Sequence, residues 1–538
     1  MEAVESVGAE AAVRAARRAR RNTIGDAVRR AAAKYRDGEA LLYGERSWTF
    51  AGLDRAADRV ARLLLGAGLG KGDRVAVYGR NSDAYLLAWL GCVRAGLVHV
   101  PANYALTAAE LGYVVEQSGA RALISDVSLA ANADAVRGSK LEIRGRFEGG
   151  GGGGAAGLDI LAAALDDGAP SDPVDADLDE EDLAQLLYTS GTTAAPKGAM
   201  MTHRALLAEY VSCIVDCELA PGDRALAALP LYHSAQMHVF LMPQMLVGAR
   251  SVLIQAPAPE VCLRLIEEHR ITSFFAPPTV WISLLRHADF DRRDLRSLEK
   301  LYYGASIMPV PVVHELRQRL PGARLFNCYG QSEIAPLATV LRPEEHAERP
   351  ASAGRPVINV ETRVVDAEMR DMPPGQPGEI VHRSPQLLTG YWDKPTETEE
   401  AFAGGWFHSG DVGYFDEAGY LFVVDRLKDV INTGGIVVAS REVEEALFSH
   451  PGVSEVAVVA LPDPKWIEAI TAVVVLRPGH PVDEAALIEH ARSRLAAYKA
   501  PKRIIFADDL PRNTAGKVLK RELRVRYGTT AAAFDAGH

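Results

Sequence analysis

The chain has 538 residues, too many for one hydrophobic core, and its 48% hydrophobic and 24% charged residues are typical of a soluble globular protein. The formal net charge of −11 argues against a dominant surface for nucleic acid or anionic membranes. No run of about 18 apolar residues occurs, so we expect no membrane span.

The N-terminal segment is rich in arginine, with five such residues between Arg14 and Arg21. Glu2, Glu5 and Glu10 precede them, whereas an organelle transit peptide is poor in acid. No apolar segment typical of a secretion signal follows. We therefore interpret this segment as a solvated helix or a frayed lead-in, and we expect a cytoplasmic protein.

From Arg46 onward, helix-like and strand-like segments alternate along the chain. Apolar residues between Leu53 and Leu64 recur at helical spacing, and the capping pair Ser82 and Asp83 opens a second predicted helix. Strands alternating with helices predict an α/β fold with largely parallel sheets. Short apolar runs predict strands at 74–79, 121–126, 250–255 and 271–277.

Two polar segments interrupt this pattern. The glycines at 149–154 lack side chains whose contacts would offset their ordering entropy, so we predict a mobile surface insertion. The acidic run 175–182 is predicted to be a solvated connector.

The five cysteines fit no zinc spacing, and their odd count favours reduced thiols. We expect Cys213 and Cys217 to lie in the core.

After Asp425 the segments become shorter. Apolar runs at 453–461 and 471–476 predict strands, and 441–450 reads as a helix. Roughly the last 110 residues are therefore expected to form a small separate α/β domain.

The most informative segment is LLYTSGTTAAPKGAMMTH, from Leu186 to His203. It is rich in hydroxyl groups and contains Lys197, but it lacks the Gly-Lys-Ser/Thr ending of the usual phosphate loop. An apolar pair at its start indicates that it leaves a strand, and Pro196 favours an extended residue before it. Backbone N–H groups, hydroxyls and the lysine would then surround a polyphosphate. The alternative, a Ser/Thr-rich turn, is disfavoured by the order YTSGTTxxPKG.

Three further motifs follow in order: NCYGQSE at 327–333, a segment with Asp411 and Arg426, and PRNTAGKVLKREL, which contains Lys517. Together with the hydroxyl-rich segment they closely resemble the adenylate-forming superfamily, in particular its acyl-CoA synthetase and aryl-CoA ligase branch. The resemblance covers about residues 47–523. It implies that a carboxylic acid attacks the α-phosphorus of ATP, giving an acyl-adenylate and pyrophosphate. A thiol, usually that of coenzyme A, then attacks the activated carbonyl and releases AMP.

The resemblance also assigns roles to individual residues. Lys517 would reach the α-phosphate and the incoming carboxylate, Glu333 would hold Mg²⁺, and His233 would stand at the acyl site. Tyr329 would stack on adenine, and Asp411 would accept both ribose hydroxyls. The expected catalytic residues are Lys517, His233, Lys197 and Glu333. The expected ATP and AMP contacts are Thr189, Ser190, Gly191, Thr192, Thr193, Lys197, Gly304, Ala305, Ser306, Asn327, Tyr329, Gly330, Gln331, Ser332, Asp411 and Arg426.

The resemblance further implies a large N-terminal domain of packed α/β subdomains and a small, mobile C-terminal domain. Lys428, in DRLKD, matches the hinge about which the small domain would rotate between the two half-reactions. This rotation would bring Lys517 to the phosphate in the first step and remove it in the second. We expect a lead-in at 1–45, the N-terminal domain at 46–425 and the C-terminal domain at 426–538.

The chain departs from the family pattern where the pantetheine arm of coenzyme A is expected to pass. Relatives commonly carry Glu-Asn where Ile436 and Val437 stand, and glycine where the stiff, β-branched Ile467 stands. Either these side chains pack within the small domain and coenzyme A enters as usual, or the adenylate passes to a partner enzyme or carrier protein. A non-catalytic nucleotide-binding protein is a third alternative, which the presence of Lys517 and Glu333 disfavours. The residues expected along the coenzyme A path are Gly434, Gly435, Ile436 and Ile467.

The acid itself is not identified by the sequence. Five large apolar residues between His233 and Pro336 would suit a bulky apolar or aryl acid, and each could equally belong to the core. They are Phe240, Trp281, Tyr302, Tyr303 and Ile334.

Overall fold

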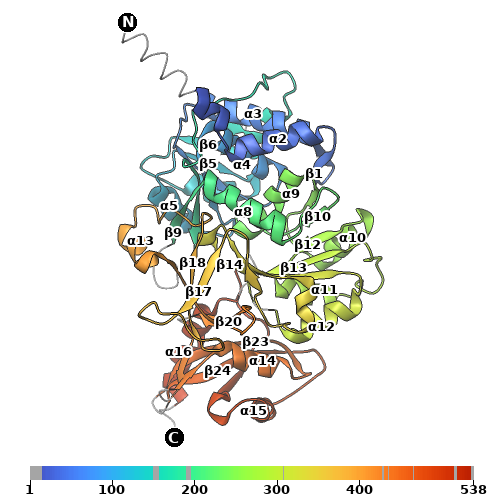
Figure 1. The fold of residues 1–538 in the computed structure, drawn as a ribbon, viewed down its shortest axis with the longest axis vertical. Coiled ribbons are helices and arrows are strands. Elements are labelled where there is room, and N and C mark those ends of the chain that lie inside the picture. Colours follow the sequence, from blue (N-terminus) through green and yellow to red (C-terminus); the bar gives the residue numbers. More distant parts are fainter. Residues whose placement is uncertain are drawn as a thin grey trace. The chain divides into compact units, whose positions relative to one another are not determined.

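The chain forms two compact units in a computed structural model, whose fold is drawn in Figure 1. The first unit comprises Met1–Phe275, Gly330–Leu337 and Ser384–Thr398, and the second comprises Ala276–Tyr329, Ala338–Arg383 and Glu399–His538. The expected domain boundaries, 45/46 and 425/426, stay predictions. The structure describes residues 15–148, 157–189, 196–306, 308–426, 429–433, 436–463, 466–513 and 518–534.

A mainly parallel sheet lies in the first unit. Its strand order is β7-β6-β5-β3-β4-β8-β9, and every neighbouring pair is parallel except β8 and β9. This sheet confirms the expected parallel α/β arrangement in the first unit. The strands are β3 (Arg74–Tyr78), β4 (Val98–Ala102), β5 (Ala122–Ser125), β6 (Ile143–Arg146), β7 (Leu158–Asp159), β8 (Leu183–Thr189) and β9 (Lys197–Thr202).

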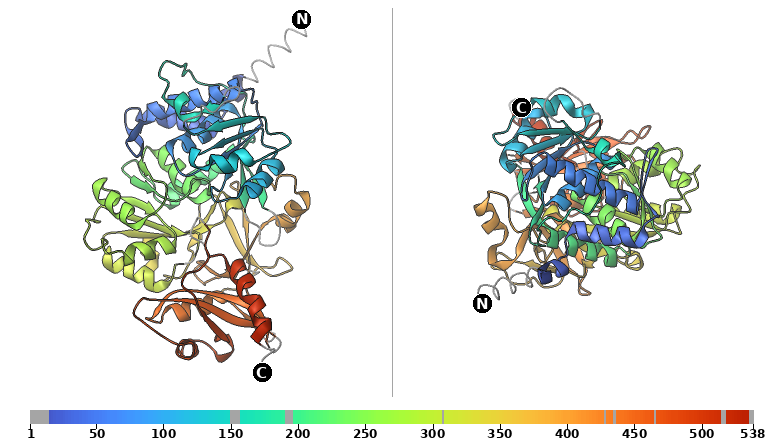
Figure 2. Two further views of the ribbon diagram at one scale, coloured as in Figure 1. Left: turned by 180° about the vertical axis from the view of Figure 1, so that it is seen from behind. Right: turned by 90° about the horizontal axis from the view of Figure 1, so that it is seen from above.

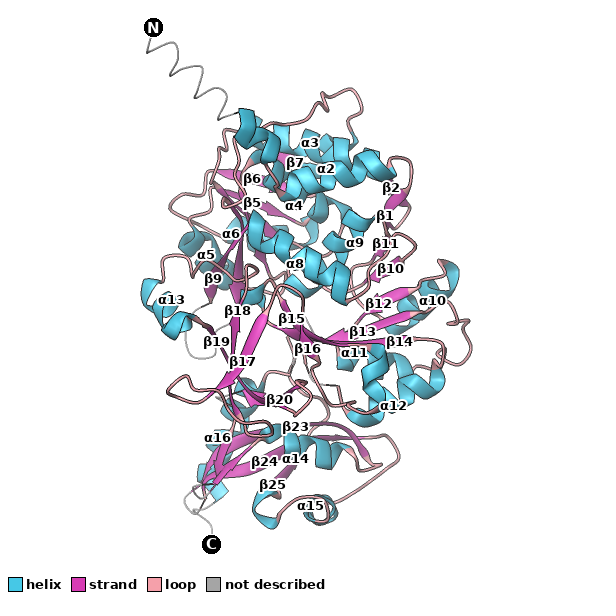
Figure 3. Ribbon diagram, in the orientation of Figure 1, coloured by secondary structure: helices cyan, strands magenta, loops and turns pink. Residues whose placement is uncertain are grey.

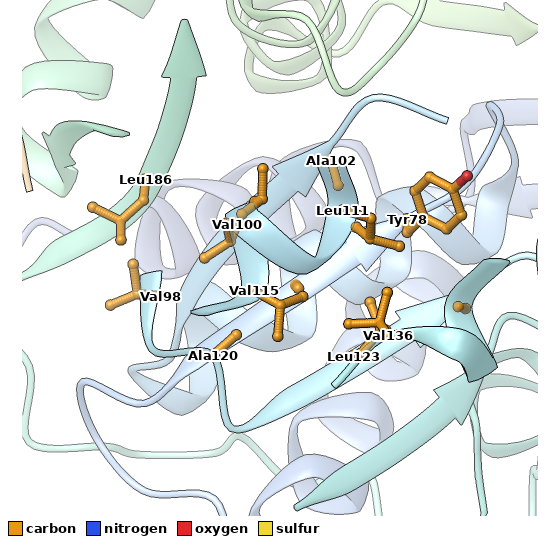
Figure 4. Close-up of a cluster of buried hydrophobic side chains, with 13 residues drawn as sticks. Tyr78, Val98, Val100, Ala102, Leu111, Val115, Ala120, Leu123, Val136 and Leu186 are labelled. Carbon is orange, nitrogen blue, oxygen red and sulfur yellow. The ribbon is translucent and has the colours of Figure 1, made fainter. Parts of the chain in front are cut away.

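Helices α5 and α6 cover one face of this sheet. Val98, Val100 and Leu186 from the strands meet Leu111 and Val115 of α5 in a buried apolar cluster (Figure 4). The alternation of side chains along each strand aims these residues at the same face. The two helices are α5 (Ala108–Ser118) and α6 (Ala130–Ala135).

Helix α4 (Asp83–Ala95) lies in the interior of the first unit. All its residues are buried, as expected of a helix that is apolar all round, and it packs against α3 and contacts β3 and β4. The Ser82 hydroxyl accepts the Tyr85 N–H, which confirms the predicted cap. Helices α2, α3 and α4 lie side by side (Figure 2). Their bounds are α2 (Ile24–Tyr35), α3 (Phe50–Gly66) and α4 (Asp83–Ala95), with α7 (Ile160–Leu165) packed on α3 and α4.

A second group of strands in the first unit runs in the order β12-β10-β11-β1-β2. The pairs are parallel except β1 with β2, which form an antiparallel hairpin. The strands are β1 (Glu39–Tyr43), β2 (Arg46–Thr49), β10 (Arg224–Ala227), β11 (Arg250–Leu253) and β12 (Ser273–Phe275). The helices are α8 (His203–Asp216), a π-helix (Ala235–Leu241), α9 (Met242–Val247), α10 (Pro259–Glu268) and α13 (Pro395–Ala401).

The second unit contains an antiparallel sheet of order β17-β18-β19-β20, which the sequence analysis did not predict (Figure 3). Its bounds are β17 (Glu361–Val365), β18 (Gly378–Arg383), β19 (Phe407–Phe415) and β20 (Leu421–Arg426). Strands β13 (Lys300–Gly304) and β14 (Arg324–Gly330) pair in parallel, and β15 (Leu337–Leu341) pairs antiparallel with β16 (Arg355–Pro356). Two helices complete this part, α11 (Pro278–Arg286) and α12 (Val310–Arg319).

The C-terminal part of the second unit is a small α/β fold, as predicted. Its sheet has the order β22-β21-β24-β23, with β25 parallel to β24. Apolar side chains from β23, β24, α14 and α15 form its core. The strands are β21 (Ile431–Thr433), β22 (Ile436–Val438), β23 (Val453–Asp463), β24 (Ile467–Leu476) and β25 (Arg503–Phe506), and the helices are α14 (Ser440–Phe448), α15 (Glu484–Arg492) and α16 (Lys520–Phe534).

The predicted lead-in and acidic connector contact each other. Arg17 pairs with Asp179 at 2.5 Å, and Arg21 pairs with Asp175 at 3.1 Å, so the acidic run is partly neutralised rather than solvated throughout. The glycines at 149–154 lie outside the described residues. All five cysteines are buried, including Cys213 of α8 and Cys217 directly after it, which were predicted to lie in the core. Among the described residues, no helix is long and apolar enough to cross a membrane.

Candidate active site

The hydroxyl-rich segment leaves strand β8, as the sequence predicts, and strand β9 follows it, which the sequence analysis did not predict. Thr189 ends β8 and is the cross-strand partner of Lys197, which begins β9. Tyr188 donates its hydroxyl hydrogen to Gln117, and this bond fixes the end of β8. Ser190, Gly191, Thr192 and Thr193 lie outside the described residues, so their phosphate contacts stay predictions.

Glu333 lies in the same unit as Lys197. The backbone carbonyl of Glu333 accepts the N–H of Leu388 at 2.9 Å, and its Oε1 accepts the hydroxyl hydrogen of Tyr391 at 3.2 Å. The Nζ of Lys197 stands 5.1 Å from the centre of the Tyr391 ring. Burial and the Glu333 carboxylate raise the pKa of Tyr391, so its hydroxyl remains a donor at neutral pH. The structure thus brings Lys197 and Glu333 to the same tyrosine.

The donor set around Glu333 fits a Mg²⁺ ion held with phosphate oxygens. Among the described residues, no group of three or more histidine, cysteine, aspartate or glutamate side chains could enclose a metal. Mg²⁺ commonly binds through one or two carboxylates, phosphate oxygens and water rather than in an all-protein cage. One carboxylate beside a predicted phosphate segment therefore suits this ion.

The predicted acyl-site histidine lies on a segment that contacts Ser332–Ile334, which we call the Glu333 segment. His233 is half-buried, and its N–H donates to the Pro230 carbonyl at 3.1 Å. The hydroxyl of the next residue, Ser234, lies 3.0 Å from that of Ser332. His233 and Glu333 therefore lie on two segments that touch within the first unit.

His238, for which the sequence offered no functional support, is a core residue. It is fully buried, and its ring nitrogens lie 2.8 Å from the Tyr210 hydroxyl and 3.0 Å from Gln185 Oε1. Burial lowers the pKa of His238 to about 3, so the ring is neutral at physiological pH.

The predicted nucleoside residues lie in the second unit. Asp411 on β19 is opposite Arg426 on β20, and this register places the Arg426 Nε 3.1 Å from Asp411 Oδ1. The Tyr329 hydroxyl donates to Asp411 Oδ2 at 2.8 Å. Only 4% of Asp411 is exposed, and the side-chain amide of Asn327 donates to the Ser352 carbonyl at 2.7 Å. The structure therefore brings three of the predicted nucleoside contacts together around one carboxylate.

The turn after β13 carries the predicted contacts Gly304, Ala305 and Ser306. A Cβ at Gly304 would lie 2.2 Å from the Cys328 carbonyl oxygen, so β13 and β14 approach closely only because this residue is glycine. Ala305 has a φ of 62°, and both Ala305 and Ser306 are exposed. Gly330 and Gln331 connect Tyr329 to Ser332 and Glu333 along the chain.

Several predicted residues of the C-terminal part lie outside the described residues: Lys517, Lys428, Gly434 and Gly435. A bridge between Arg512 and Val518 closes the ends of the segment that contains Lys517. Ile436 begins β22. Ile467 begins β24 with a φ of 69° and is 60% exposed, which excludes the alternative that its side chain packs within the small domain.

The five residues considered for a bulky acid belong to the core. Phe240 stacks on Phe275 at 4.5 Å, the Trp281 indole N–H donates to the Tyr302 carbonyl at 3.1 Å, and the Tyr303 hydroxyl lies 3.0 Å from His346. None of the five is more than 2% exposed. Their large apolar side chains therefore do not indicate the acid.

Sequence reasoning missed Tyr391, which contacts both predicted charged residues of the phosphate region. It also missed Gln386 and Glu209, which form a buried hydrogen-bonded pair beside the Glu333 segment. The sequence feature that could have pointed to Tyr391 is GYW at 390–392, a glycine followed by two aromatic residues between polar segments.

Two family models match the chain: AMP-binding enzyme over residues 28–392, and AMP-binding enzyme C-terminal domain over residues 442–517. Feruloyl-CoA synthase of Amycolatopsis sp is 38% identical over 489 residues, which cover 91% of this chain and 96% of that protein. The fatty acid–[acyl-carrier-protein] ligase ScoC of Streptomyces coeruleorubidus is 34% identical over 499 residues, covering 91% of this chain and 93% of that protein.

A solved structure has the same fold over nearly the whole chain. The anthranilate CoA ligase AuaEII in complex with anthranoyl-AMP gives a TM-score of 0.87 at 26% identity, covering 95% of this chain and 98% of that chain. These matches confirm the α/β fold with a large N-terminal and a small C-terminal domain, and they confirm the predicted enzyme class, an AMP-forming acid–thiol ligase. The chain belongs to the AMP-binding enzyme family, within the adenylate-forming superfamily.

Proposed function

We propose that this protein activates an aryl or other bulky carboxylic acid with ATP and transfers the acyl group to coenzyme A. The observation that carries the proposal is that Lys197, which follows the hydroxyl-rich segment, and Glu333 both contact Tyr391. A cation and a carboxylate so arranged suit a triphosphate together with Mg²⁺. The full-length relationship to feruloyl-CoA synthase supports the acid class.

In the first step, a carboxylate oxygen of the acid forms a bond to the α-phosphorus of ATP. The bond from that phosphorus to the bridging oxygen breaks, and pyrophosphate leaves. Both reactants are anions, so their approach requires positive charge. Lys197 would neutralise the outer phosphates and Lys517 the reacting ones, and Glu333 would hold Mg²⁺, which supplies further neutralisation when bound.

The nucleoside would be held by the second unit's predicted contacts. Asp411 accepts hydrogen bonds from Tyr329 and Arg426, and a carboxylate offers about four acceptor positions. Positions therefore remain for the two ribose hydroxyls. The ring of Tyr329 would stack on adenine, with its orientation fixed by the bond to Asp411.

In the second step, the sulfur of coenzyme A forms a bond to the acyl carbon as its proton leaves. The bond from that carbon to the phosphate oxygen breaks and releases AMP. His233, on the segment that touches Ser332, would stand at the acyl group. The rotation about Lys428 would withdraw Lys517 before this step.

A second candidate function is transfer of the acyl group to a carrier protein or partner enzyme. The observation that favours it is Ile467, a β-branched residue at a φ of 69°, which is a conformation that costs such a side chain roughly 1–3 kcal/mol. Its side chain is exposed at a position where the resemblance to the family implies a glycine, and ScoC, a related protein, is named as a ligase to an acyl carrier protein.

One experiment tests both candidates. Pyrophosphate release is measured over aryl, fatty and polycyclic acids, and acyl-adenylate and acyl-CoA are then quantified for the best acid. Acyl-CoA formed as fast as adenylate supports the first candidate, and accumulating adenylate supports the second. If Ile467 obstructs coenzyme A, Ile467→Gly raises the acyl-CoA rate and leaves adenylate formation unchanged. The absence of pyrophosphate release with every acid would contradict the proposed activation.

A further inference from the structure

One segment of the first unit, residues 386–392, holds strand β9 and the Glu333 segment together. On one side, the N–H of Met200 donates to the Gly390 carbonyl at 2.9 Å, and the N–H of Trp392 donates to the Gly198 carbonyl at 2.8 Å. On the other side, the N–H of Leu388 donates to the Glu333 carbonyl at 2.9 Å. We call residues 386–392 the bridging segment, because its backbone fixes the distance between the two segments it pairs with.

The bridging segment is anchored by a buried polar group at its start. The Gln386 Nε2 donates to the Leu337 carbonyl at 2.9 Å and to Glu209 Oε2 at 2.5 Å. Glu209 Oε1 in turn accepts the N–H of Leu337 at 3.0 Å. Both side chains are fully buried. These bonds tie Leu337, four residues after Glu333, to the start of the bridging segment.

At Gly390 the bridging segment adopts a backbone conformation that favours glycine. Gly390 has a φ of 152°, and a Cβ there would lie 2.9 Å from Thr398 Cγ2 and 3.2 Å from the Met200 methyl group. The next residue, Tyr391, therefore begins from a fixed backbone position. Its N–H donates to the Thr398 hydroxyl at 2.9 Å, which further limits its movement.

Tyr391 presents two different chemical groups to two charged residues. Its ring face receives the ammonium of Lys197 at 5.1 Å, within the range of a cation–π contact. Its hydroxyl donates to Glu333 Oε1 at 3.2 Å. Within the described residues, the hydrogen bonds of the Glu333 carboxylate involve Oε1 alone, so Oε2 is left for another partner.

We infer that Tyr391 is a positioning residue, which engages one oxygen of Glu333 so that the other faces a Mg²⁺ ion bound with ATP. The inference rests on the proposed function. A carboxylate held by one oxygen binds a metal through the other, in a single orientation, and the partners of metal ligands typically change metal affinity about 10–100-fold. The same ring contacts the ammonium of Lys197, to which the proposed function assigns the outer phosphates.

The test uses the full-length protein and titration calorimetry of ATP, with Mg²⁺ and separately with EDTA. Tyr391→Phe keeps the ring face for Lys197 and removes the hydroxyl. We expect it to weaken ATP binding about tenfold with Mg²⁺, at the lower end of such effects, and to leave binding in EDTA unchanged. Tyr78→Phe is the matched control, since its hydroxyl donates to the Leu106 carbonyl at 2.8 Å away from Glu333. This control should leave both affinities unchanged.

A double-mutant cycle with Glu333→Gln separates positioning from structural support. If Tyr391 acts through Glu333, Tyr391→Phe has no further effect on Mg²⁺-dependent binding in the Glu333→Gln protein. Tyr391→His, which keeps a ring and an N–H donor, should restore part of the affinity. Equal weakening in EDTA, fully additive effects, or a Tyr391→Phe affinity within twofold of wild type would overturn the inference. Failure of the wild-type protein to bind ATP would instead contradict the proposed function.

Discussion

We call the predicted phosphate contacts in the first unit the phosphate half and the predicted nucleoside contacts in the second unit the nucleoside half, and the two sets of residues hold their carboxylates in different ways. Asp411, in the nucleoside half, is almost completely buried, and both of its oxygens are engaged, by Tyr329 and by Arg426. Glu333, in the phosphate half, is half-buried, and within the described residues only its Oε1 is engaged, by Tyr391.

This difference corresponds to the ligands that each half is expected to bind. Ribose hydroxyls are neutral donors, and a carboxylate already paired with Arg426 can accept them without leaving a buried charge alone. Triphosphate and Mg²⁺ are charged. We therefore expect Glu333 to gain a cation and Lys197 to gain an anion as partner only when the triphosphate and Mg²⁺ bind. Asp411 already has a protein partner on each oxygen, and we propose that Glu333 gains the partner of its second oxygen from the ligand.

The largest expected effect comes from a residue that belongs to neither half. Lys517→Ala should lower adenylate formation about 1,000-fold, because Lys517 would neutralise charge on the reacting atoms themselves. Thioester formation from supplied acyl-adenylate should be spared, since the lysine would act only in the first step. Rapid-quench kinetics of each half-reaction measures this. Equal losses in both would show that Lys517 is not specific to adenylation.

In the phosphate half, Glu333→Gln should raise the Mg²⁺ concentration needed for half-maximal ATP use about 10–100-fold. The thermal midpoint should hardly change, because the Gln side chain can still accept the Tyr391 hydroxyl hydrogen. Initial rates across a Mg²⁺ series and a thermal melt of both proteins measure the two quantities. An unchanged Mg²⁺ requirement would reject the metal role of Glu333.

One pair of substitutions compares the two halves directly. Asp411→Ala should weaken ATP binding and also lower the free energy of unfolding by about 1–3 kcal/mol, since Tyr329 and Arg426 lose a buried partner. Lys197→Met should weaken ATP binding about tenfold and cost less than about 1 kcal/mol of stability, the value of its ring contact. Calorimetry and denaturant unfolding measure both. Similar stability losses in the two variants would show that the protein contacts of Asp411 and Lys197 contribute equally to stability.

The phosphate half could be predicted from sequence only in part. The apolar pair at 186–187 predicted that the hydroxyl-rich segment leaves a strand, and β8 confirms this; the returning strand β9 was not predicted. The parallel sheet was also predictable, because buried parallel strands are continuous apolar runs. The bridging segment was not, since its hydrogen bonds come from the backbone and join residues far apart in sequence.

The nucleoside half was predictable through its motifs but not through its strand pattern. Asp411 and Arg426 were named from the resemblance, whereas the antiparallel sheet that makes them neighbours was missed. Strands β19 and β20 mix half-buried and buried residues without clear alternation, so the period-2 signal is weak. Ile467 shows a further limit, because a β-branched residue gives no sequence signal for the left-handed φ that it adopts opposite Thr433.

The smallest expected effect concerns the anchor of the bridging segment. Burial raises the pKa of Glu209 well above its ordinary value of 4.5, so the folded protein retains a proton that the unfolded chain loses. The stability contributed by the protonated form is therefore present below pH 4.5 and is lost as pH rises toward the folded pKa. Between pH 5 and pH 8, the thermal midpoint of wild type should fall relative to Glu209→Gln by about 2 °C or more.

The control for this prediction is Glu417→Gln, which changes an exposed carboxylate. It should show the same pH dependence as wild type. A constant difference between wild type and Glu209→Gln across this pH range would mean that the folded protein does not retain an extra proton on Glu209 there.

The proposed activation of an acid through an acyl-adenylate is tested most directly by isotope transfer. The best acid, labelled with ¹⁸O in both carboxyl oxygens, is incubated with ATP, Mg²⁺ and the acceptor, and the products are analysed by mass spectrometry. Attack of the carboxylate on the α-phosphorus leaves one labelled oxygen in AMP, so we predict one ¹⁸O per AMP and none in pyrophosphate. Unlabelled AMP, or ¹⁸O in phosphate or pyrophosphate, would contradict the account.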